Sequence, residues 1–247
     1  MDSMDNRRVI VMGGSSGIGE ATARMFAACG ADVVIAGRDP AKLERALGRI
    51  GRGTPRVVDA TNPADVARCF AEVGPFDYLV LTLSGAAGGG PFAEIDLAQL
   101  RQGFDAKFWA YVSTVQAALP ALRPGGSVTL VTAGSARAAI PGTTGLAAIN
   151  GALEAMIRPL AIELAPLRVN AVSPGIIDTP WWDAQPATLR EAIFARAAAA
   201  LPVGRVGTPD DVAAAVVFVA TNGFMTGTVI ECDGGGRFPL PVGPHPR

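Results

Sequence analysis

The sequence predicts an α/β fold in which a doubly wound parallel sheet of the Rossmann type forms a single domain, and three observations lead to this prediction. Short runs of Val, Ile and Leu alternate with helix-length segments, as expected for a parallel sheet covered by helices on both faces. The first run is followed by glycines and then by a helical segment, which is the order of a βαβ unit. With 247 residues and 49% hydrophobic content, the chain can also bury one sizeable core.

The individual elements follow from this alternation. The first strand is the apolar run at 8–12 and the second is the β-branched run at 31–36, because such residues favour strands. The later strands are expected at 56–59, 77–83, 127–132, 167–172 and 228–232. The helices are expected at 20–29, 40–50, 62–73, 96–119, 144–164 and 209–221.

Two segments break the alternation. The segment 176–207 contains the adjacent Trp181 and Trp182, several prolines and an alanine-rich helix. It is too long for a simple connection, so we expect it to form a substrate lid. The C-terminal tail, 237–247, is rich in Pro and Gly and is predicted to be irregular.

Composition excludes several classes of function. The 21 basic and 22 acidic side chains are interspersed, which argues against a nucleic-acid partner. The three cysteines form no C-x-x-C pair, and we find no apolar stretch long enough for a signal peptide or a membrane span, so we expect a cytoplasmic protein without a membrane partner. The single histidine, His245, lies in the tail. Histidine-based hydrolysis and histidine-ligated metal sites are therefore not expected, and we predict no metal.

The turn after the first strand is the strongest functional motif. It reads Gly13-Gly14-Ser15-Ser16-Gly17-Ile18-Gly19 and leads into a predicted helix, the context that makes a glycine pattern specific. Glycines let backbone N–H groups approach a pyrophosphate, and the start of the helix favours negative charge. We interpret the turn as a phosphate cradle rather than a mere connection.

This motif resembles the cofactor fingerprint of the short-chain dehydrogenase/reductase family, T-G-x-x-x-G-x-G, with Met12 in place of the Thr. Further matching segments are Asp59, Arg168-Val169-Asn170, the run from Ser173 to Thr179, Thr226-Gly227 and Asp233-Gly234-Gly235. The resemblance implies a nicotinamide dinucleotide and a homo-oligomer, either a tetramer or a dimer, formed by the helices at 96–119 and 144–164 with the last strand. The cofactor contacts it implies are Gly13, Ser15, Ser16, Gly17, Ile18, Gly19, Asp59, Pro174, Gly175, Ile177 and Thr179.

The residues after the second strand select the dinucleotide. An acidic residue there would bind a ribose 2′-hydroxyl, whereas an arginine would pair with a 2′-phosphate. The chain has Gly37-Arg38. We therefore expect NADP(H) rather than NAD(H), although Arg38 could also be a solvated surface charge.

The catalytic residues of the family are not present. Members use a Tyr and a Lys four residues later, a Ser at the end of the preceding strand, and an Asn from the long helix. The comparison places Leu146 at the Tyr, Asn150 at the Lys and Lys107 at the Asn. Ala133 falls at the Ser, or Ser135 if the alignment slips by two residues. Neither Leu146 nor Asn150 can donate a proton near neutral pH.

Three explanations remain open. Reduction could use a substitute acid centred on Lys107, with Tyr111, Ser135 and Asn150 as further candidates; Lys107 and Tyr111 share a helix face, so an ammonium could lower the pKa of the phenol. The substrate could instead be an enone or imine that needs no tyrosine-like donor. Finally, the chain could be a non-redox isomerase, cyclase or dehydratase, or a cofactor-binding regulatory protein.

The substrate is expected to be a small apolar or aromatic molecule. Trp181 and Trp182 of the lid, together with Ala133 and Leu146, are predicted to line a largely apolar site. Arg137 is a candidate for binding an anionic group of the substrate. Our first interpretation is an NADP(H)-dependent reductase of a carbonyl, enone or imine compound.

Overall fold

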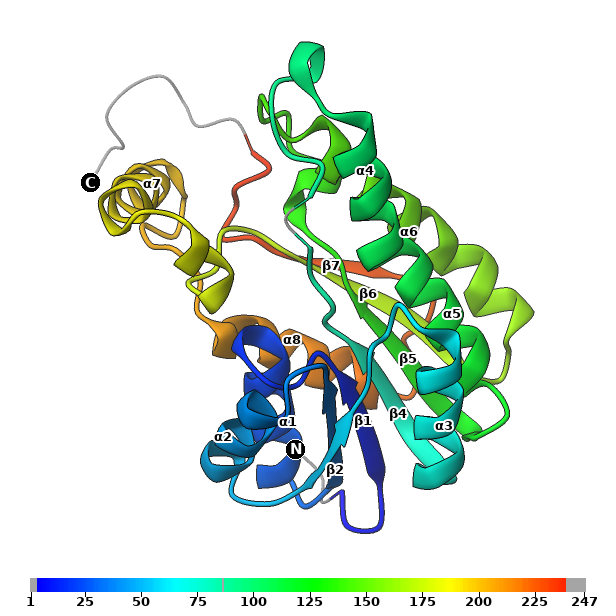
Figure 1. The fold of residues 1–247 in the computed structure, drawn as a ribbon. Coiled ribbons are helices and arrows are strands. Elements are labelled where there is room, and N and C mark those ends of the chain that lie inside the picture. The colour runs from blue at the N-terminus through cyan, green and yellow to red at the C-terminus, as the bar shows by residue number, and fades with distance from the viewer. Residues whose placement is uncertain (1–3, 86, 239–247) are drawn as a thin grey trace.

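A single seven-stranded parallel sheet forms the centre of the computed structural model, which describes residues 4–85 and 87–238 (Figure 1). Its strand order is β3-β2-β1-β4-β5-β6-β7, and all six pairings are parallel. The strands are β1 (Arg8–Met12), β2 (Asp32–Gly37), β3 (Thr54–Val57), β4 (Phe76–Leu81), β5 (Leu122–Val131), β6 (Arg168–Pro174) and β7 (Val229–Cys232). The order reverses between β1 and β4, so the prediction of a doubly wound sheet is confirmed.

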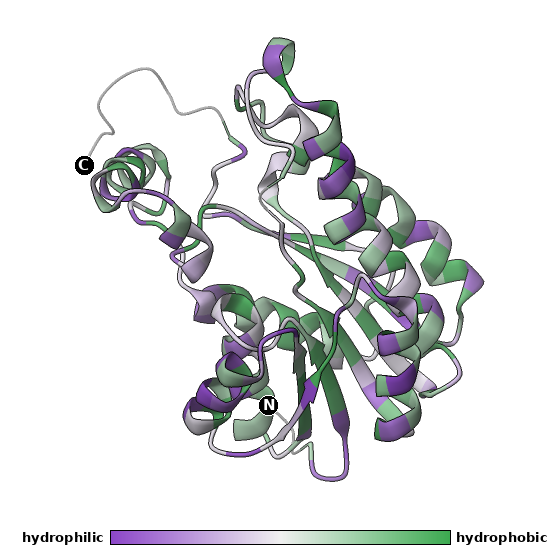
Figure 2. Ribbon diagram, in the orientation of Figure 1, coloured by the Kyte–Doolittle hydropathy of each residue, from purple (hydrophilic) through white to green (hydrophobic). Residues whose placement is uncertain are grey.

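Helices cover both faces of this sheet (Figure 1). One face carries α1 (Gly17–Ala28), α2 (Pro40–Ile50) and α8 (Pro209–Thr221), and the other carries α3 (Pro63–Val73), α5 (Ala110–Ala118) and α6 (Thr144–Glu163). Successive residues of a strand point to opposite faces. Ile10 and Met12 therefore join the core under α3, α5 and α6, while Val9 and Val11 join the core under α1, α2 and α8. Figure 2 shows the apolar strands enclosed by helices with polar outer surfaces.

The helix predicted at 96–119 is continuous but not uniform. It begins as α4 (Leu97–Gly103), passes through a π-helical turn, η2 (Phe104–Trp109), and continues as α5. A π-helical turn bonds i to i+5 and is common at functional sites. Lys107 lies inside this turn.

Most other predicted boundaries differ from the structure by only a few residues. The third strand was expected at 56–59 but occupies Thr54–Val57, because its pairing begins at Val34 opposite Thr54. The fifth strand begins at Leu122, five residues earlier than expected, and pairs with Phe76 before a shift in register. The carboxyl end of the third strand lies two residues earlier than expected and that of the fifth strand one residue earlier, so the ends of the strands, where the candidate site lies, differ little from the prediction.

The helix α6 corrects one expectation from the sequence. Among the described helices it alone is long and apolar enough to cross a membrane by length and composition, whereas the sequence was judged to contain no such stretch. Ile149, Leu153 and Ile157 of this helix are buried in the domain, and Leu153 and Ile157 join the core beside the sheet. Core helices of globular domains satisfy the same criterion, so this property has a packing explanation.

The predicted lid segment contains a 3-10 helix, η4 (Pro180–Ala184), and then α7 (Ala187–Ala200). In Figure 1, α7 stands away from the sheet, beyond the ends of β6 and β7. Another 3-10 helix, η1 (Phe92–Glu94), precedes α4, and η3 (Gly134–Ala136) follows β5. Of the tail predicted to be irregular, residues 237 and 238 form a turn and a bend, while the rest of it, including His245, lies outside the described residues.

Candidate active site

The glycine-rich turn leaves no room for a side chain at Gly13 or Gly19, because neighbouring atoms lie too close. Gly13 and Gly17 have φ angles of +86° and +54°, values that L side chains rarely adopt. A Cβ atom at Gly19 would lie 2.2 Å from the Gly13 carbonyl oxygen. The helix α1 begins at Gly17, followed by Ile18, and no side chain caps its N-terminus. The turn therefore presents backbone N–H groups at the carboxyl end of β1, as an anion cradle requires.

The end of β2 lies beside this turn. A Cβ atom at Gly37 would be 3.3 Å from the Ser15 hydroxyl oxygen, and the exposed Arg38 follows directly. The pKa of Asp59 is lowered because Thr61 donates backbone and side-chain hydrogen bonds to its carboxylate, and the charge of Arg38 contributes. Arg38 and Asp59 therefore lie on the same side of the turn, as their expected adenosine roles require.

The loop after β6 forms the opposite side of the turn. Gly175 approaches the backbone so closely that a Cβ atom there would lie 2.8 Å from the Asp233 Cα atom. Ile177 is buried and bridges to Gly207, and a Cβ atom at Gly17 would lie 3.3 Å from Thr179 Cβ. Thr179 is thus brought to the phosphate turn from a distant part of the chain, and Pro174, Gly175 and Ile177 lie just before it in the sequence.

Lys107 is a buried cation at the carboxyl end of β5. Its side chain donates a hydrogen bond from Nζ to the Thr132 carbonyl oxygen at 3.3 Å, and the residue is 9% exposed. Burial lowers the pKa of Lys107 to about 8, against the opposing effect of the negative charge of Glu154. An amine with this pKa exchanges its proton near neutrality, which is the property expected of a general acid or base.

The hydroxyl group of Tyr111, a further candidate for the proton donor, is engaged with the backbone. Lys107 Nζ does lie 5.8 Å from the centre of its ring, as the shared helix face predicts. The hydroxyl group, however, is enclosed by the carbonyl oxygens of Leu81, Leu83 and Val131, at 2.8–3.2 Å. Burial raises the pKa of Tyr111, so the phenol acts as a hydrogen-bond donor that ties α5 to β4 and β5.

Asn150 and Ser135 are brought together. The Asn150 amide donates to the Ser135 hydroxyl oxygen at 3.3 Å and to the Leu146 carbonyl oxygen at 2.9 Å. Within the described residues, Asn150 Oδ1 is buried and has no hydrogen-bond partner. Of the two alternatives for the serine position, Ser135 is thus the one in contact with Asn150, whereas Ala133 precedes η3 and offers no polar side chain. Leu146 is half-buried on the same helix as Asn150.

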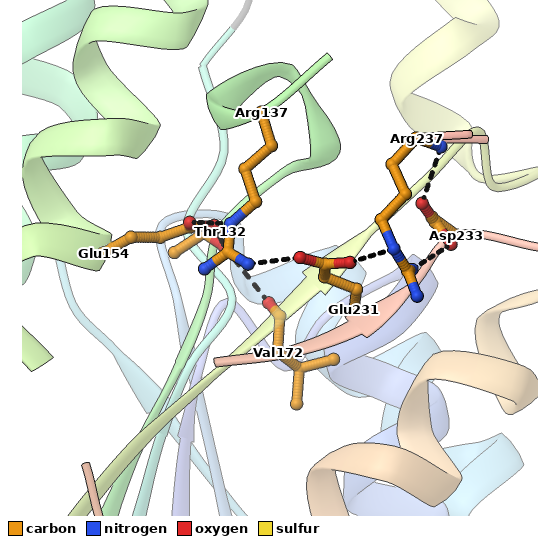
Figure 3. A network of polar contacts seen from close by, with 7 residues as sticks. All are labelled: Thr132, Arg137, Glu154, Val172, Glu231, Asp233 and Arg237. Carbon is orange, nitrogen blue, oxygen red and sulfur yellow. Dashed lines mark hydrogen bonds and ion pairs between the residues drawn. The ribbon is translucent and has the colours of Figure 1, made fainter. Parts of the chain in front are cut away.

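Arg137, the candidate for binding an anionic group of the substrate, belongs to a network of charged side chains (Figure 3). It donates from Nε to Glu154 at 2.8 Å and also pairs with Glu231. Arg237 pairs with Glu231 from the other side and with Asp233 at 2.9 Å. Two carboxylates therefore already balance the charge of Arg137.

Glu154 is the residue of this site that sequence reasoning missed. Its side chain is 8% exposed, and its carboxylate accepts a hydrogen bond from the Thr132 hydroxyl group at 2.8 Å. The available signal was its spacing, because Glu154 follows Asn150 by four residues and so shares its helix face. Among the described residues, no three His, Cys, Asp or Glu side chains gather to hold a metal ion.

The segment 176–207, predicted to form a lid, is built around a cluster of aromatic rings. Trp182 donates from Nε1 to the Ile177 carbonyl oxygen at 3.0 Å and packs edge-on against Phe194, with ring centres 5.4 Å apart. Trp181 is 40% exposed and contacts Trp182. Trp182 thus ties η4 and α7 to the start of this segment at Ile177, and Trp181 is the more exposed of the two adjacent tryptophans.

Comparison with protein families and curated proteins yields matches along almost the whole chain. Residues 13–236 match a family model described as enoyl-(acyl carrier protein) reductase. The chain is 33% identical, over 249 residues, to cis-4-hydroxycyclohexanecarboxylate dehydrogenase of Sinomonas cyclohexanicum, covering 95% of this chain and 98% of the relative.

Solved structures give the same result. A small-chain dehydrogenase in complex with NADPH is similar with a TM-score of 0.84 and 36% identity, covering 94% of this chain and 99% of that one. An NADPH-bound short-chain oxidoreductase from Pseudomonas aeruginosa PAO1, described as containing an atypical catalytic centre, has a TM-score of 0.85 and 27% identity. That match covers 95% of this chain and 98% of the other.

Proposed function

Because this chain belongs to the short-chain dehydrogenase/reductase family, we propose that it is an NADP(H)-dependent oxidoreductase with Lys107 as its proton source. Its substrate would be an apolar or aromatic carbonyl, enone or imine compound. Its relatives are oxidoreductases of this family, and similar solved structures are NADPH complexes.

The residues of the glycine turn fit a nicotinamide dinucleotide. The N–H groups at the start of α1 would hold the pyrophosphate, and the exposed Arg38 would pair with the 2′-phosphate that distinguishes NADP(H). Asn150 Oδ1 is a buried acceptor without a partner among the described residues, suited to a hydroxyl group of the cofactor. The bound, reduced nicotinamide would supply a hydride. NADPH complexes of two structural relatives support this choice.

The observation that carries the proposal is the buried amine of Lys107. Reduction of a carbonyl leaves an oxygen that must gain a proton, and the pKa of about 8 lets Lys107 release one near neutral pH. Ser135, oriented by Asn150 at 3.3 Å, is the neighbouring hydroxyl group. The relative with an atypical catalytic centre supports the idea that the fold accepts other residues at this place.

The surroundings of the site favour an apolar substrate. Leu146 and Ala133 replace polar groups of the family with hydrocarbon, and the half-exposed Trp181 lies on the segment 176–207, which we propose as a lid. Such walls bind rings and short hydrocarbon groups.

We also propose a homo-oligomer, a tetramer or a dimer, formed through the long helices. Trp109 on η2 and Ile162 on α6 are 57% and 80% exposed. Large apolar side chains on neighbouring helices are typical of a surface that another subunit covers.

A second candidate is a non-redox enzyme, such as an isomerase, cyclase or dehydratase, or a cofactor-binding regulatory protein. It is favoured by the absence of a usable phenol, because Leu146 has no hydroxyl group and Tyr111 is enclosed by backbone carbonyls. The two candidates differ in whether bound NADPH is consumed.

The test combines binding and turnover. NADPH and NADH binding is measured by fluorescence, and loss of NADPH absorbance is followed with a panel of ketones, enones and imines. For Lys107→Met we expect NADPH affinity within about threefold of the wild type and kcat/KM at least about 100-fold lower, the usual contribution of a general acid. Lys42→Met, at an exposed lysine of α2, is the matched control. Unchanged turnover in Lys107→Met would exclude Lys107 as the proton source, and tight binding without any turnover by the wild type would favour the non-redox candidate.

A further inference from the structure

The proton affinity of Lys107 depends on what surrounds it, and Thr132 connects it to a carboxylate. The Thr132 carbonyl oxygen accepts from Lys107 at 3.3 Å, while its hydroxyl group donates to Glu154 at 2.8 Å. Thr132 is 3% exposed. One residue at the end of β5 thus holds the buried ammonium and the buried carboxylate in a fixed relation.

Arg137 binds the same carboxylate. It pairs with Glu154 Oε2 at 2.8 Å, whereas Thr132 donates to Oε1, and its other end pairs with Glu231. Arg137 is 40% exposed and Glu154 only 8%, so Arg137 is an outer cation on this buried carboxylate (Figure 3). Lys107 is the inner cation, connected to the carboxylate through Thr132. A negative charge near a buried amine favours the protonated form of that amine, and the charge of Glu154 acts on Lys107 in this direction.

In the described part of the chain, the helices packed against η2 carry no buried charged side chain near Lys107 other than Glu154. Besides Lys107 itself, the ionisable side chains on the helices packed against η2 are either Glu154, the enclosed phenol of Tyr111, or exposed. The exposed ones are Arg101, Asp105, Arg158 and Glu163.

We propose that Glu154 is a positioning residue that keeps Lys107 protonated, and that Arg137 moderates this effect by sharing the carboxylate. The inference rests on the proposed function only where it concerns catalysis. The ion pairs of Arg137 with Glu154 and Glu231 would then adjust the fraction of the Lys107 amine that is protonated at neutral pH. Lys107 is the group that would act on the substrate, and Glu154 acts through it.

The composition makes a direct test available. The chain has only two lysines, Lys42 and Lys107, so labelling lysine side chains with ¹³C gives two sets of NMR signals. Lys42 is exposed on α2 and serves as an internal reference in every sample. Titration of the wild type, Glu154→Gln and Arg137→Gln then reports the Lys107 midpoint without any substrate.

The expected shifts have opposite signs. Removing the negative charge in Glu154→Gln lowers the Lys107 midpoint by at least about one pH unit, and removing the competing cation in Arg137→Gln raises it. A Lys107 midpoint in Glu154→Gln equal to that of the wild type would overturn the inference. If Glu154→Gln does not fold, Thr132→Val, which removes the hydroxyl group that holds the carboxylate, is expected to lower the midpoint, and an unchanged value there would overturn the inference as well.

Kinetics separate this inference from the proposed function. If Lys107 is the proton source, the basic limb of the pH profile of kcat/KM moves to lower pH in Glu154→Gln, in step with the NMR midpoint. A shifted midpoint with an unshifted profile would leave the coupling intact and refute the proposed role of Lys107. An unshifted midpoint would refute the coupling and leave that role unaffected.

Discussion

Replacing Lys107 with methionine should make the protein more stable at neutral pH, because the wild type keeps a cation inside the domain. The pKa of Lys107 falls from an ordinary value of 10.5 to about 8 in the folded state. At about pH 7 this difference costs the folded state about 3 kcal/mol. Methionine has a similar shape without the charge, but it leaves the Thr132 carbonyl oxygen without its donor, at a cost of about 1 kcal/mol. The expected net gain for Lys107→Met is therefore about 2 kcal/mol.

The pH dependence of this gain is the sharper part of the prediction. Between the folded and unfolded pKa values the unfolded chain binds more protons, so the Lys107 contribution to wild-type stability rises with pH across that window. At about pH 9.5 the remaining cost of Lys107 is about 1.4 kcal/mol, so the difference between the variant and the wild type shrinks by about 2 kcal/mol. Other titrating groups cancel in that difference.

Denaturant unfolding of both proteins at about pH 7 and about pH 9.5, followed by circular dichroism, measures this double difference. Lys42→Met, at an exposed position, should show no dependence on pH. A difference between Lys107→Met and the wild type that stays constant over this range would refute the reasoning, because it would mean that Lys107 keeps its ordinary proton affinity in the folded protein.

Three further predictions concern the cofactor turn and the buried phenol. Gly19→Ala forces a Cβ atom to within 2.2 Å of the Gly13 carbonyl oxygen. Calorimetry should therefore show NADPH affinity lowered at least about tenfold, and the free energy of unfolding should fall by about 1–3 kcal/mol. The control Gly48→Ala, in an open position of α2, should leave stability unchanged or raise it. Arg38→Glu should weaken NADPH binding by about 10- to 100-fold in the same assay, since a carboxylate repels the 2′-phosphate, and a loss of NADH binding of equal size would contradict the assignment. Tyr111→Phe should cost about 1–2 kcal/mol in denaturant unfolding but leave kcat within about threefold, whereas a large loss of kcat with an intact fold would restore Tyr111 as a proton donor.

Most of the fold could be predicted from the sequence because the strands are short, apolar and separated by helical segments. The succession of strands and helices, the turn at Gly13–Gly19 and the bounds of α2 and α8 follow from local patterns that act within a few residues. The π-helical turn could not be predicted, since its residues are compatible with an ordinary helix and the wider hydrogen bonding depends on what packs around it.

The candidate site could be predicted only in part. Lys107, Ser135 and Asn150 were found by their places in a known pattern, and the structure brings Asn150 to Ser135. Whether the Tyr111 hydroxyl group and the Arg137 guanidinium group are already engaged depends on partners far away in the chain, such as the Leu81 carbonyl oxygen and Glu231. A side chain's chemistry is visible in a sequence, but whether its bonding capacity is already used is decided by tertiary structure.

The widened turn at Phe104–Trp109 also bears on how such a site could arise. A π-helical turn holds one residue more than an α-helical turn, and here ordinary helix precedes and follows it, so the surplus is accommodated locally. Gain of a single codon at this place could thus present a new amine while the hydroxyl group of Tyr111 kept its backbone partners. In a regular α-helical turn, which has no surplus to take up the change, one added or lost codon would rotate everything that follows by about 100°. A long helix with one π-helical turn can therefore present a new functional side chain on one face while the rest of the domain keeps its packing.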